Sequence, residues 1–518
     1  MRKRMPRTED QLGFDFSAER AQISTAEMGS PGGYTGFYRF HKYWGKKPYE
    51  PLAYIIEQLT SPGDIVLDPF CGSGTAAREA LLRSRKFIGF DINPVALEIT
   101  RLLIHPPPPP ALRDAIRHLS DAARPEILKS YFLEDGTSVA THYLWNANEL
   151  EKVWLVGRGA ARGRRELAPT AHDQSLSDSF AEYHSKLIRQ PRFFTNSRIN
   201  AAPEMNLDAV LTGRAQRNID LLLQAIEPCP DSVRPALKLC LTAASGQMTR
   251  MVFAVTGRGK TTGMSSEKTE VGSWVIGYWR PKLHFEVNAW NCFEKRTGTL
   301  LRAISCDRTL NSSRLASSVS ELVGGNSDAL LARGDCRSLL GTLPDECVQL
   351  VITDPPHSDR MPYLELSELW NSILGVDVDF SQEIVISNAK ERGKTSDSYR
   401  ESMMEFLSQV PRVLRPDGVL VLLYNAREAE EWEAFRAVCE GSSDGDMSGL
   451  RYLGIFPCNY SARSVVQDNR KGSLPNDLAL VFCKASSLSS DGHFLRKLER
   501  IPDWSAELPE HLRCKGLE

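Results

Sequence analysis

The chain has 518 residues, 42% of them hydrophobic and 25% charged, which is the composition of an ordinary globular protein with more than one domain. Its formal net charge of -2 excludes a general attraction to nucleic acid, so a nucleic-acid site has to be a local basic surface. The eleven cysteines include no Cys-x-x-Cys pair, which argues against a zinc ribbon or a disulfide scaffold and for a reducing interior.

The N-terminal residues 1–6 are basic, but no apolar run follows them, so they do not form a secretory signal. No stretch is long and apolar enough to span a membrane. We therefore expect a cytoplasmic protein, and we expect no metal site.

The first part of the chain alternates between strands and helices. Residues 1–36 are polar and are expected to be flexible. After them the pattern predicts helices at 51–59, 75–83 and 94–103 and buried strands at 65–67 and 86–91. The five prolines Pro106 to Pro110 are expected to stop regular structure and to act as a stiff spacer.

The alternation resumes only at Ala329. The pattern there predicts strands at 329–333, 348–353, 419–424, 452–456 and 478–482, and helices at 335–343, 364–374, 399–414 and 428–439. Two strands before the spacer and five after it predict an α/β fold, a doubly wound seven-stranded Rossmann-like sheet with a final antiparallel pair. One unit would comprise 37–110 and 328–485, an inserted domain would occupy 111–327, and 486–518 would form a tail.

A glycine turn follows the first strand, in Asp68-Pro69-Phe70-Cys71-Gly72-Ser73-Gly74-Thr75. Glycines at this point let backbone N–H groups approach a ligand closely. Asp68 is placed to accept hydrogen bonds from an amino group, and Asp91, at the end of the next strand, to bind ribose hydroxyls. A nicotinamide enzyme has similar spacing, but this turn lacks the third glycine of that motif.

These residues resemble the cofactor motif of the S-adenosylmethionine-dependent DNA amino-methyltransferases. The resemblance implies that Asp68, Pro69 and Phe70 lie beside the cofactor, that Gly72 and Gly74 line its methionine part, and that Asp91 binds its ribose. It also implies that Asp335, after the third strand, binds the adenine amino group, although Asp335 is equally placed to cap the following helix. The unit formed by 37–110 and 328–485 would then be the methyltransferase domain.

The segment His41 to Pro48 resembles the lead-in that closes over the methionine carboxylate in this family. The resemblance makes His41, Lys42 and Trp44 candidate cofactor contacts, because cationic and backbone donors suit a carboxylate. The alternative is that these residues form a surface patch.

A second motif, Asp354-Pro355-Pro356-His357, follows the strand at 348–353. The resemblance makes it the clamp for the target amine, in which Asp354 and the Pro355 carbonyl each accept one amine hydrogen. The family usually has Tyr or Phe, which stacks on a flipped-out base, at the position of His357. This departure allows a weakened, differently tuned or inactive enzyme. Tyr363 is placed either to supply the missing aromatic face or to pack at the start of a helix.

The order of the two motifs places the target-recognition domain of this family in the insert, and basic residues there and in two later loops suit phosphate contacts. The candidates for contacting DNA are Arg158, Arg162, Arg164, Arg165, Arg192, Lys394 and Arg463. For each of them the alternative is an ordinary solvated loop.

The resemblance therefore implies a DNA adenine-N6 methyltransferase that uses S-adenosylmethionine, binds DNA and acts in a restriction-modification or phage-defence system with companion proteins. The alternatives are N4-cytosine methylation, methylation of an RNA amino group, and a non-catalytic DNA-binding member of a defence complex. The last of these depends on the departure at His357.

Overall fold

The protein is described here from a computed structural model. The structure describes residues 36–157, 163–256, 269–274, 276–307, 313–357, 361–424, 449–458 and 477–485. Within these ranges, no helix is both long enough and apolar enough to cross a lipid bilayer. The helix expected at 428–439 and the tail 486–518 lie outside the described residues, as do the candidates Arg158, Arg162 and Arg463.

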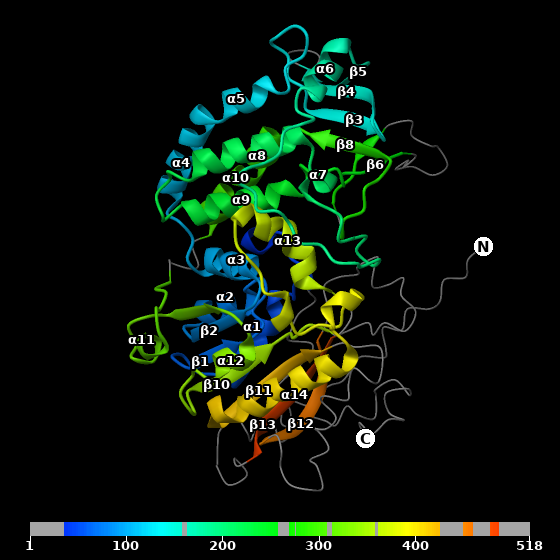
Figure 1. The fold of residues 1–518 in the computed structure, drawn as a ribbon. Coiled ribbons are helices and arrows are strands. Elements are labelled where there is room, and N and C mark those ends of the chain that lie inside the picture. Colours follow the sequence, from blue (N-terminus) through cyan, green and yellow to red (C-terminus); the bar gives the residue numbers. More distant parts are fainter. Residues whose placement is uncertain are drawn as a thin grey trace, which may run out of the picture.

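A seven-stranded sheet forms the larger unit, in the order β12-β13-β11-β10-β1-β2-β9 (Figure 1). Its strands are β1 Ile65–Asp68, β2 Lys86–Asp91, β9 Ala329–Arg333, β10 Val348–Thr353, β11 Leu414–Tyr424, β12 Leu450–Cys458 and β13 Asp477–Lys484. Strand β13 runs antiparallel to both β11 and β12, whereas the other pairings are parallel. The predicted fold class and its seven strands are confirmed.

Helices cover both faces of this sheet. One face packs against α1 Tyr49–Leu59, α2 Thr75–Leu82 and α3 Pro94–Ile104 in a core that continues into the insert. The other face packs against α11 Val319–Val323, α12 Cys336–Leu340 and α14 Ser396–Val413. Neighbouring residues of one strand therefore belong to different cores, as Val66 and Leu67 do, which is the physical reason that these strands are apolar throughout.

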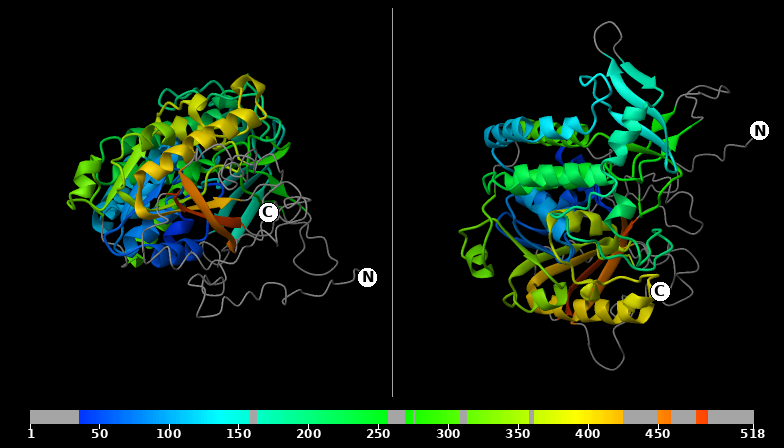
Figure 2. Two further views of the ribbon diagram at one scale, coloured as in Figure 1. Left: turned by 90° about the horizontal axis from the view of Figure 1, so that it is seen from below. Right: turned by 45° about the horizontal axis from the view of Figure 1, so that its top comes forward.

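The insert has its own sheet, in the order β5-β4-β3-β8. Its elements are α4 Pro109–Ala122, α5 Arg124–Lys129, β3 His142–Asn146, β4 Glu149–Gly157, β5 Gly163–Leu167, α6 Ala171–Asp178, α7 Leu207–Val210, α8 Gly213–Ile226, α9 Arg234–Ser245, β6 Ala254–Val255, β7 Glu270–Val271, β8 Leu283–Val287 and α10 Ala289–Cys306. The right-hand view of Figure 2 shows the cyan strands of this sheet far from the orange and red strands of the larger one.

The proline run differs from the expectation. Helix α3 ends at Ile104 and α4 already begins at Pro109, so only residues 105–108 connect them. Pro109 and Pro110 start a helix because proline lacks an N–H that the first turn would leave without an intrahelical partner in any case.

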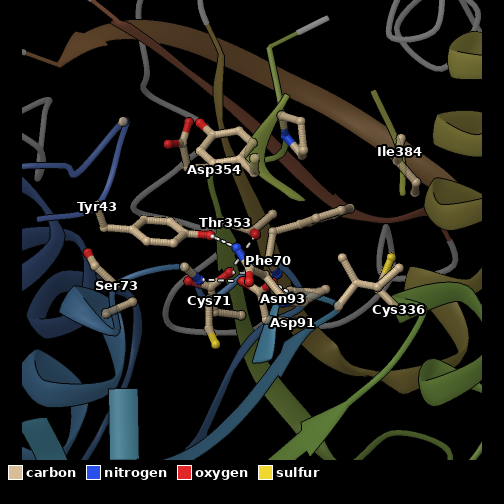
Figure 3. A pocket seen from close by; sticks show the side chains of 18 of the residues that line it. Tyr43, Phe70, Cys71, Ser73, Asp91, Asn93, Cys336, Thr353, Asp354 and Ile384 are labelled. Atoms are coloured by element: carbon tan, nitrogen blue, oxygen red, sulfur yellow. Dashed lines mark hydrogen bonds between the residues drawn. The ribbon is translucent and has the colours of Figure 1, made fainter. Parts of the chain in front are cut away.

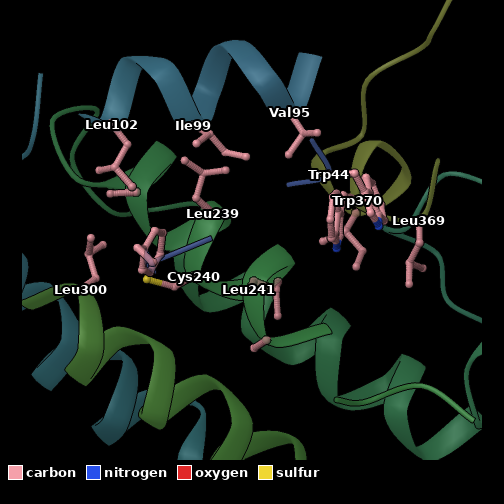
Figure 4. Close-up of a cluster of buried hydrophobic side chains, with 14 of the residues drawn as sticks. Trp44, Val95, Ile99, Leu102, Leu239, Cys240, Leu241, Leu300, Leu369 and Trp370 are labelled. Carbon is pink, nitrogen blue, oxygen red and sulfur yellow. The ribbon is translucent and has the colours of Figure 1, made fainter. Parts of the chain in front are cut away.

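Helix α13, Tyr363–Leu374, lies where the two units meet (Figure 1). It packs against α3 of the sheet unit and α9 of the insert. Three buried tryptophans from distant segments meet on it: Trp370 of α13 stacks on Trp44 with ring centroids 4.8 Å apart, and Trp274 packs edge-on against both. Figure 4 shows Trp44 and Trp370 among side chains of α3 and α9.

We expect Trp370→Ala to lower the free energy of unfolding by about 3–5 kcal/mol, because the truncation leaves a cavity where both units and the lead-in meet. Urea denaturation followed by circular dichroism measures this change. The matched control is Trp279→Ala, whose side chain is 52% exposed and whose loss should cost less than about 1 kcal/mol. Equal losses in the two variants would contradict the role given to the tryptophan cluster.

Candidate active site

A large cavity opens at the carboxyl ends of β1, β2 and β10, the edge of a parallel sheet where ligands usually bind. It encloses about 920 Å³ of empty space, its open mouth included, which suits a ligand of nucleoside size. Figure 3 shows Tyr43 and Ser73 on one side of it, and Ile384 and Cys336 on the other. The cavity brings together residues of the lead-in, the glycine turn, the ends of three strands and the segment before α14.

The glycine turn connects β1 to α2 along one wall of the cavity. Gly72 and Gly74 both have positive φ, +48° and +75°, which favours glycine. The Gly72 N–H donates to Asp91 at 2.8 Å, which ties the turn to the end of β2. A Cβ on Gly74 would lie 2.8 Å from the Thr100 Cα, so the structure gives Gly74 a packing role against α3, outside the cavity lining.

Asp68 and Asp91 are the last residues of the neighbouring strands β1 and β2, and both line the cavity. Burial raises the pKa of Asp68 to about 7 and that of Asp91 to about 6. Asp68 accepts hydrogen bonds from the Thr353 hydroxyl at 2.6 Å and the Phe70 N–H at 3.1 Å, and these oppose the shift. The site therefore keeps two buried carboxyl groups whose charge changes near neutral pH.

Asp335 caps a helix, as one of its two predicted roles requires, and it also lies where the other role would place it. It lines the cavity, and it caps α12 by accepting from the Arg337 N–H at 2.9 Å. The Arg337 guanidinium also binds its carboxylate, at 2.6 Å from Oδ2.

The tip formed by Asp354 to His357 follows β10 and reaches the same cavity. Asp354 and Pro356 line it, and the Tyr399 hydroxyl of α14 donates to the Pro356 carbonyl at 2.7 Å, which anchors the tip. His357 does not stand open for stacking. Its Nε2 lies 2.7 Å from Asp354 Oδ1, and its ring packs edge-on against Tyr424 at 5.2 Å.

Some residues of the lead-in, 41–48, contact the insert, and others line the cavity. His41 is buried and contacts the Thr242 hydroxyl of α9 at 3.0 Å, and the Lys42 ammonium donates to the Trp274 carbonyl at 3.0 Å. Neither of them lines the cavity, whereas Trp44 does. His41 and Lys42 therefore join the lead-in to the insert in this structure.

Sequence reasoning missed several residues of the cavity wall. The lysines that line the cavity are Lys46 and Lys47 rather than the predicted Lys42. Burial lowers the pKa of Lys46 to about 7. Tyr43 stacks on Tyr363, with ring centroids 5.8 Å apart. Asn93 lies two residues after Asp91, the last residue of β2, so its position just after a strand could have predicted that it lines the cavity. No local pattern singles out Lys47.

Asn93 is the polar link between the cavity and α13. Its side-chain amide donates to the Ser367 hydroxyl at 2.8 Å and to the Tyr43 hydroxyl at 3.3 Å. Asn93, two residues after the end of β2, therefore holds the Tyr43 ring in place, and Tyr43 in turn stacks on Tyr363.

The described candidates for nucleic-acid contact differ in whether their charged groups already contact other residues of the protein. Arg165 is exposed on β5. Arg164 is held in place, with its guanidinium 4.0 Å from the Trp154 ring centroid and 2.7 Å from Glu166. Arg192 is exposed and lies over the Phe194 ring at 4.9 Å, whereas the Lys394 ammonium donates to the Ser381 carbonyl.

The cavity fits S-adenosylmethionine. Two carboxyl groups suit the ammonium and the ribose hydroxyls, and the Phe70, Ile92 and Ile384 side chains give apolar surface for a purine ring. Gly72 has no side chain, and a Cβ there would already lie 3.4 Å from the Tyr43 ring. Among the described residues, no cluster of His, Cys, Asp and Glu could hold a metal ion.

One family model matches a segment of the chain that includes the first motif. Residues 18–102 match the N6/N4 methyltransferase family model, described as DNA methylase. DNA adenine methyltransferase YhdJ of Escherichia coli (strain K12) is 52% identical over 48 residues, which are 9% of this chain and 16% of that protein. Type II methyltransferase M2.DpnII of Streptococcus pneumoniae is 39% identical over 67 residues, 12% of this chain and 25% of that protein.

The chain thus spans at most about a quarter of the length of these two relatives. A solved rRNA methyltransferase, aviRa from Streptomyces viridochromogenes, aligns over 91% of this chain and 96% of its own with 11% identity and a TM-score of 0.25. That superposition is too loose to add to the fold, which rests on the order of the seven strands. The segment that builds the glycine turn and the end of β2 is thus similar to the DNA methylase family over residues 18–102.

Proposed function

We propose that this protein is a DNA adenine-N6 methyltransferase of a restriction-modification or phage-defence system. The observation that carries the proposal is that Asp354, at the end of β10, opens into the same cavity as the glycine turn and the two buried carboxyl groups. A methyl donor and an amine acceptor would meet there. The similarity to a protein named DNA adenine methyltransferase favours adenine, and the similarity to a type II methyltransferase favours restriction-modification.

In this proposal the cofactor supplies an electrophilic methyl group, and the protein supplies position and charge. Asp68 faces the ammonium of the methionine part, Asp91 the ribose and Asp335 the adenine. The side chains of Phe70 and Ile384 and the ring of Pro69 enclose the apolar part of the ligand.

The clamp prepares the target amine. The lone pair of an aryl amine is delocalised into the ring, so the amine is a poor nucleophile. Asp354 would accept one N–H and the Pro355 carbonyl the other, which favours a tetrahedral nitrogen with its lone pair towards the methyl group. Pro355 and Pro356 stiffen the tip, and Tyr399 fixes it from α14.

The contact between His357 and Asp354 favours one second candidate, a DNA-binding protein of a defence complex without turnover. In this arrangement the imidazole edge occupies a place beside the catalytic carboxylate, and stacking on a flipped base requires the ring to swing away. N4-cytosine methylation uses the same clamp and is distinguished by the product.

The DNA itself would lie against basic residues of the insert and of the loop before α14. Arg165 and Arg192 are the exposed members, and the Arg192 guanidinium over an aromatic ring is also suited to stack on a base. We assign Arg164 and Lys394 smaller contributions because their charged groups already contact other residues.

We expect Asp354→Ala to abolish methyl transfer while S-adenosylmethionine still binds, because Asp354 contacts the amine rather than the cofactor. The protein is incubated with unmethylated genomic DNA and the cofactor, and the nucleosides are analysed by mass spectrometry. The control is Asp377→Ala, whose side chain is 97% exposed, and it should leave N6-methyladenine formation unchanged. Loss of cofactor binding together with transfer in a folded Asp354→Ala protein would contradict the clamp assignment. N4-methylcytosine as the product would show that the target base is cytosine rather than adenine.

We expect cofactor affinity to rise with pH through about 6 to 7, where Asp91 and Asp68 lose their protons. Burial raises both pKa values, so the protonated forms persist at low pH and neither attract an ammonium nor accept as well from hydroxyls. Isothermal titration calorimetry between about pH 5.5 and 7.5 should show up to about tenfold tighter binding per pH unit. Asp68→Asn should flatten the part near pH 7, and a flat wild-type profile would count against both contacts.

We expect Arg165→Ala to weaken DNA binding and to reduce the slope of log affinity against log salt by about one, as the loss of one phosphate contact does. Fluorescence anisotropy with a labelled duplex at several salt concentrations measures the slope. Arg117→Ala on α4, with a side chain that is 67% exposed, is the matched control and should leave the slope unchanged. An unaltered slope in Arg165→Ala would mean that Arg165 does not contact a phosphate of the DNA and that this part of β5 is an ordinary solvated surface.

A further inference from the structure

One lysine links the candidate catalytic carboxylate to a second carboxylate. The Lys47 ammonium donates to Asp477 at 2.6 Å and lies 3.1 Å from Asp354 Oδ1. The three side chains come from the lead-in, from the tip after β10 and from the first residue of β13. Lys47 is 10% exposed and Asp477 only 4%, so water screens this group weakly.

Among the described residues, the nitrogen contacts of Asp354 fall on one oxygen. Lys47 Nζ and His357 Nε2 both lie near Oδ1, at 3.1 and 2.7 Å. Within the described part of the chain this leaves Oδ2 as the oxygen that accepts from a substrate. The carboxylate is therefore oriented before the substrate arrives, and orientation of this kind is a main source of catalysis in a reaction without a covalent intermediate.

Asp477 shares the positive charge of Lys47 with Asp354. The Lys47 ammonium faces both carboxylates, that of Asp477 at 2.6 Å and that of Asp354 at 3.1 Å. Lys47 alone would offset the negative charge of Asp354, and Asp477 reduces that effect. Negative charge beside the amine suits a reaction in which positive charge passes from a sulfonium to the attacking nitrogen.

We propose that Lys47 and Asp477 are positioning residues for methyl transfer: together they hold the Asp354 carboxylate in place, with Oδ2 directed at the target amine. The inference rests on the proposed function and goes beyond the two motifs, neither of which contains these residues. Without Lys47, the Asp354 and Asp477 carboxylates would face the same site with no cation between them, and their repulsion would turn Asp354 away from its position. Without Asp477, the ammonium would neutralise Asp354 as an acceptor.

The test is a double-mutant cycle with Lys47→Met, Asp477→Asn and the double variant, measured as single-turnover methyl transfer to DNA together with the Kd for S-adenosylmethionine. We expect Lys47→Met to slow transfer on the order of 10²-fold, as removal of one electrostatic group in an active site does. Asp477→Asn should cost about tenfold. The double variant should be faster than Lys47→Met, because it also removes the Asp477 carboxylate that repels Asp354 once Lys47 is gone.

The cofactor Kd should change less than the rate in all three variants, and Lys47→Arg should recover part of the loss because it keeps the charge. If Lys47→Met does not fold, the comparison is made between Asp477→Asn and Lys47→Arg. Slower methyl transfer in Asp477→Asn than in Lys47→Arg supports the proposal, and equal transfer rates in these two variants contradict it. A double variant as slow as Lys47→Met would make the link a structural tie and overturn the proposal. Unchanged transfer in Lys47→Met would contradict this inference alone, whereas a wild-type protein that methylates no DNA contradicts the proposed function as well.

Discussion

The burial of α13 is the constraint on which the rest of the structure depends. Ten of its twelve residues are buried, and they include charged and polar side chains that are costly to bury without partners. The sheet unit supplies Asn93 for Ser367 and Asn371, and the insert supplies Arg189 for Glu368 and Asn196 for Glu365. The observed placement of the two units gives each of these four α13 side chains at least one hydrogen-bond partner. Because the clamp tip and Tyr363 lie immediately before and at the start of α13, that placement also fixes the active site.

Much of this arrangement could be predicted because of one physical rule. Strands buried on both faces are continuous apolar runs, and the residues after parallel strands meet at one edge of the sheet. Asp68 and Asp91 were predicted from their positions at strand ends, whereas Asp335 and Asp354 were predicted from the family resemblance, and all four line one cavity. The strand pattern and the resemblance together therefore predicted that the two motifs would meet.

The parts that sequence reasoning missed are contacts between distant segments. His41 lies in a segment rich in aromatic and basic residues, but its partner Thr242 is about two hundred residues away, and no periodicity links them. The prolines at 109–110 were read for their stiffness, although the same fixed φ suits the first turn of a helix. Composition identified an unusual segment in both cases but did not identify what it contacts.

The antiparallel strand explains why Asp477 was not among the candidate residues. Parallel strands present their last residues at the cavity edge of the sheet, and the residues predicted from the sequence lie at such strand ends. Strand β13 runs against β11, with Leu478 opposite Tyr424, so it presents its first residue there instead. Asp477 thereby reaches the same edge as Asp354 and can share Lys47 with it. In a mixed sheet, residues that precede antiparallel strands belong among the candidates for an active site as much as those that follow parallel ones.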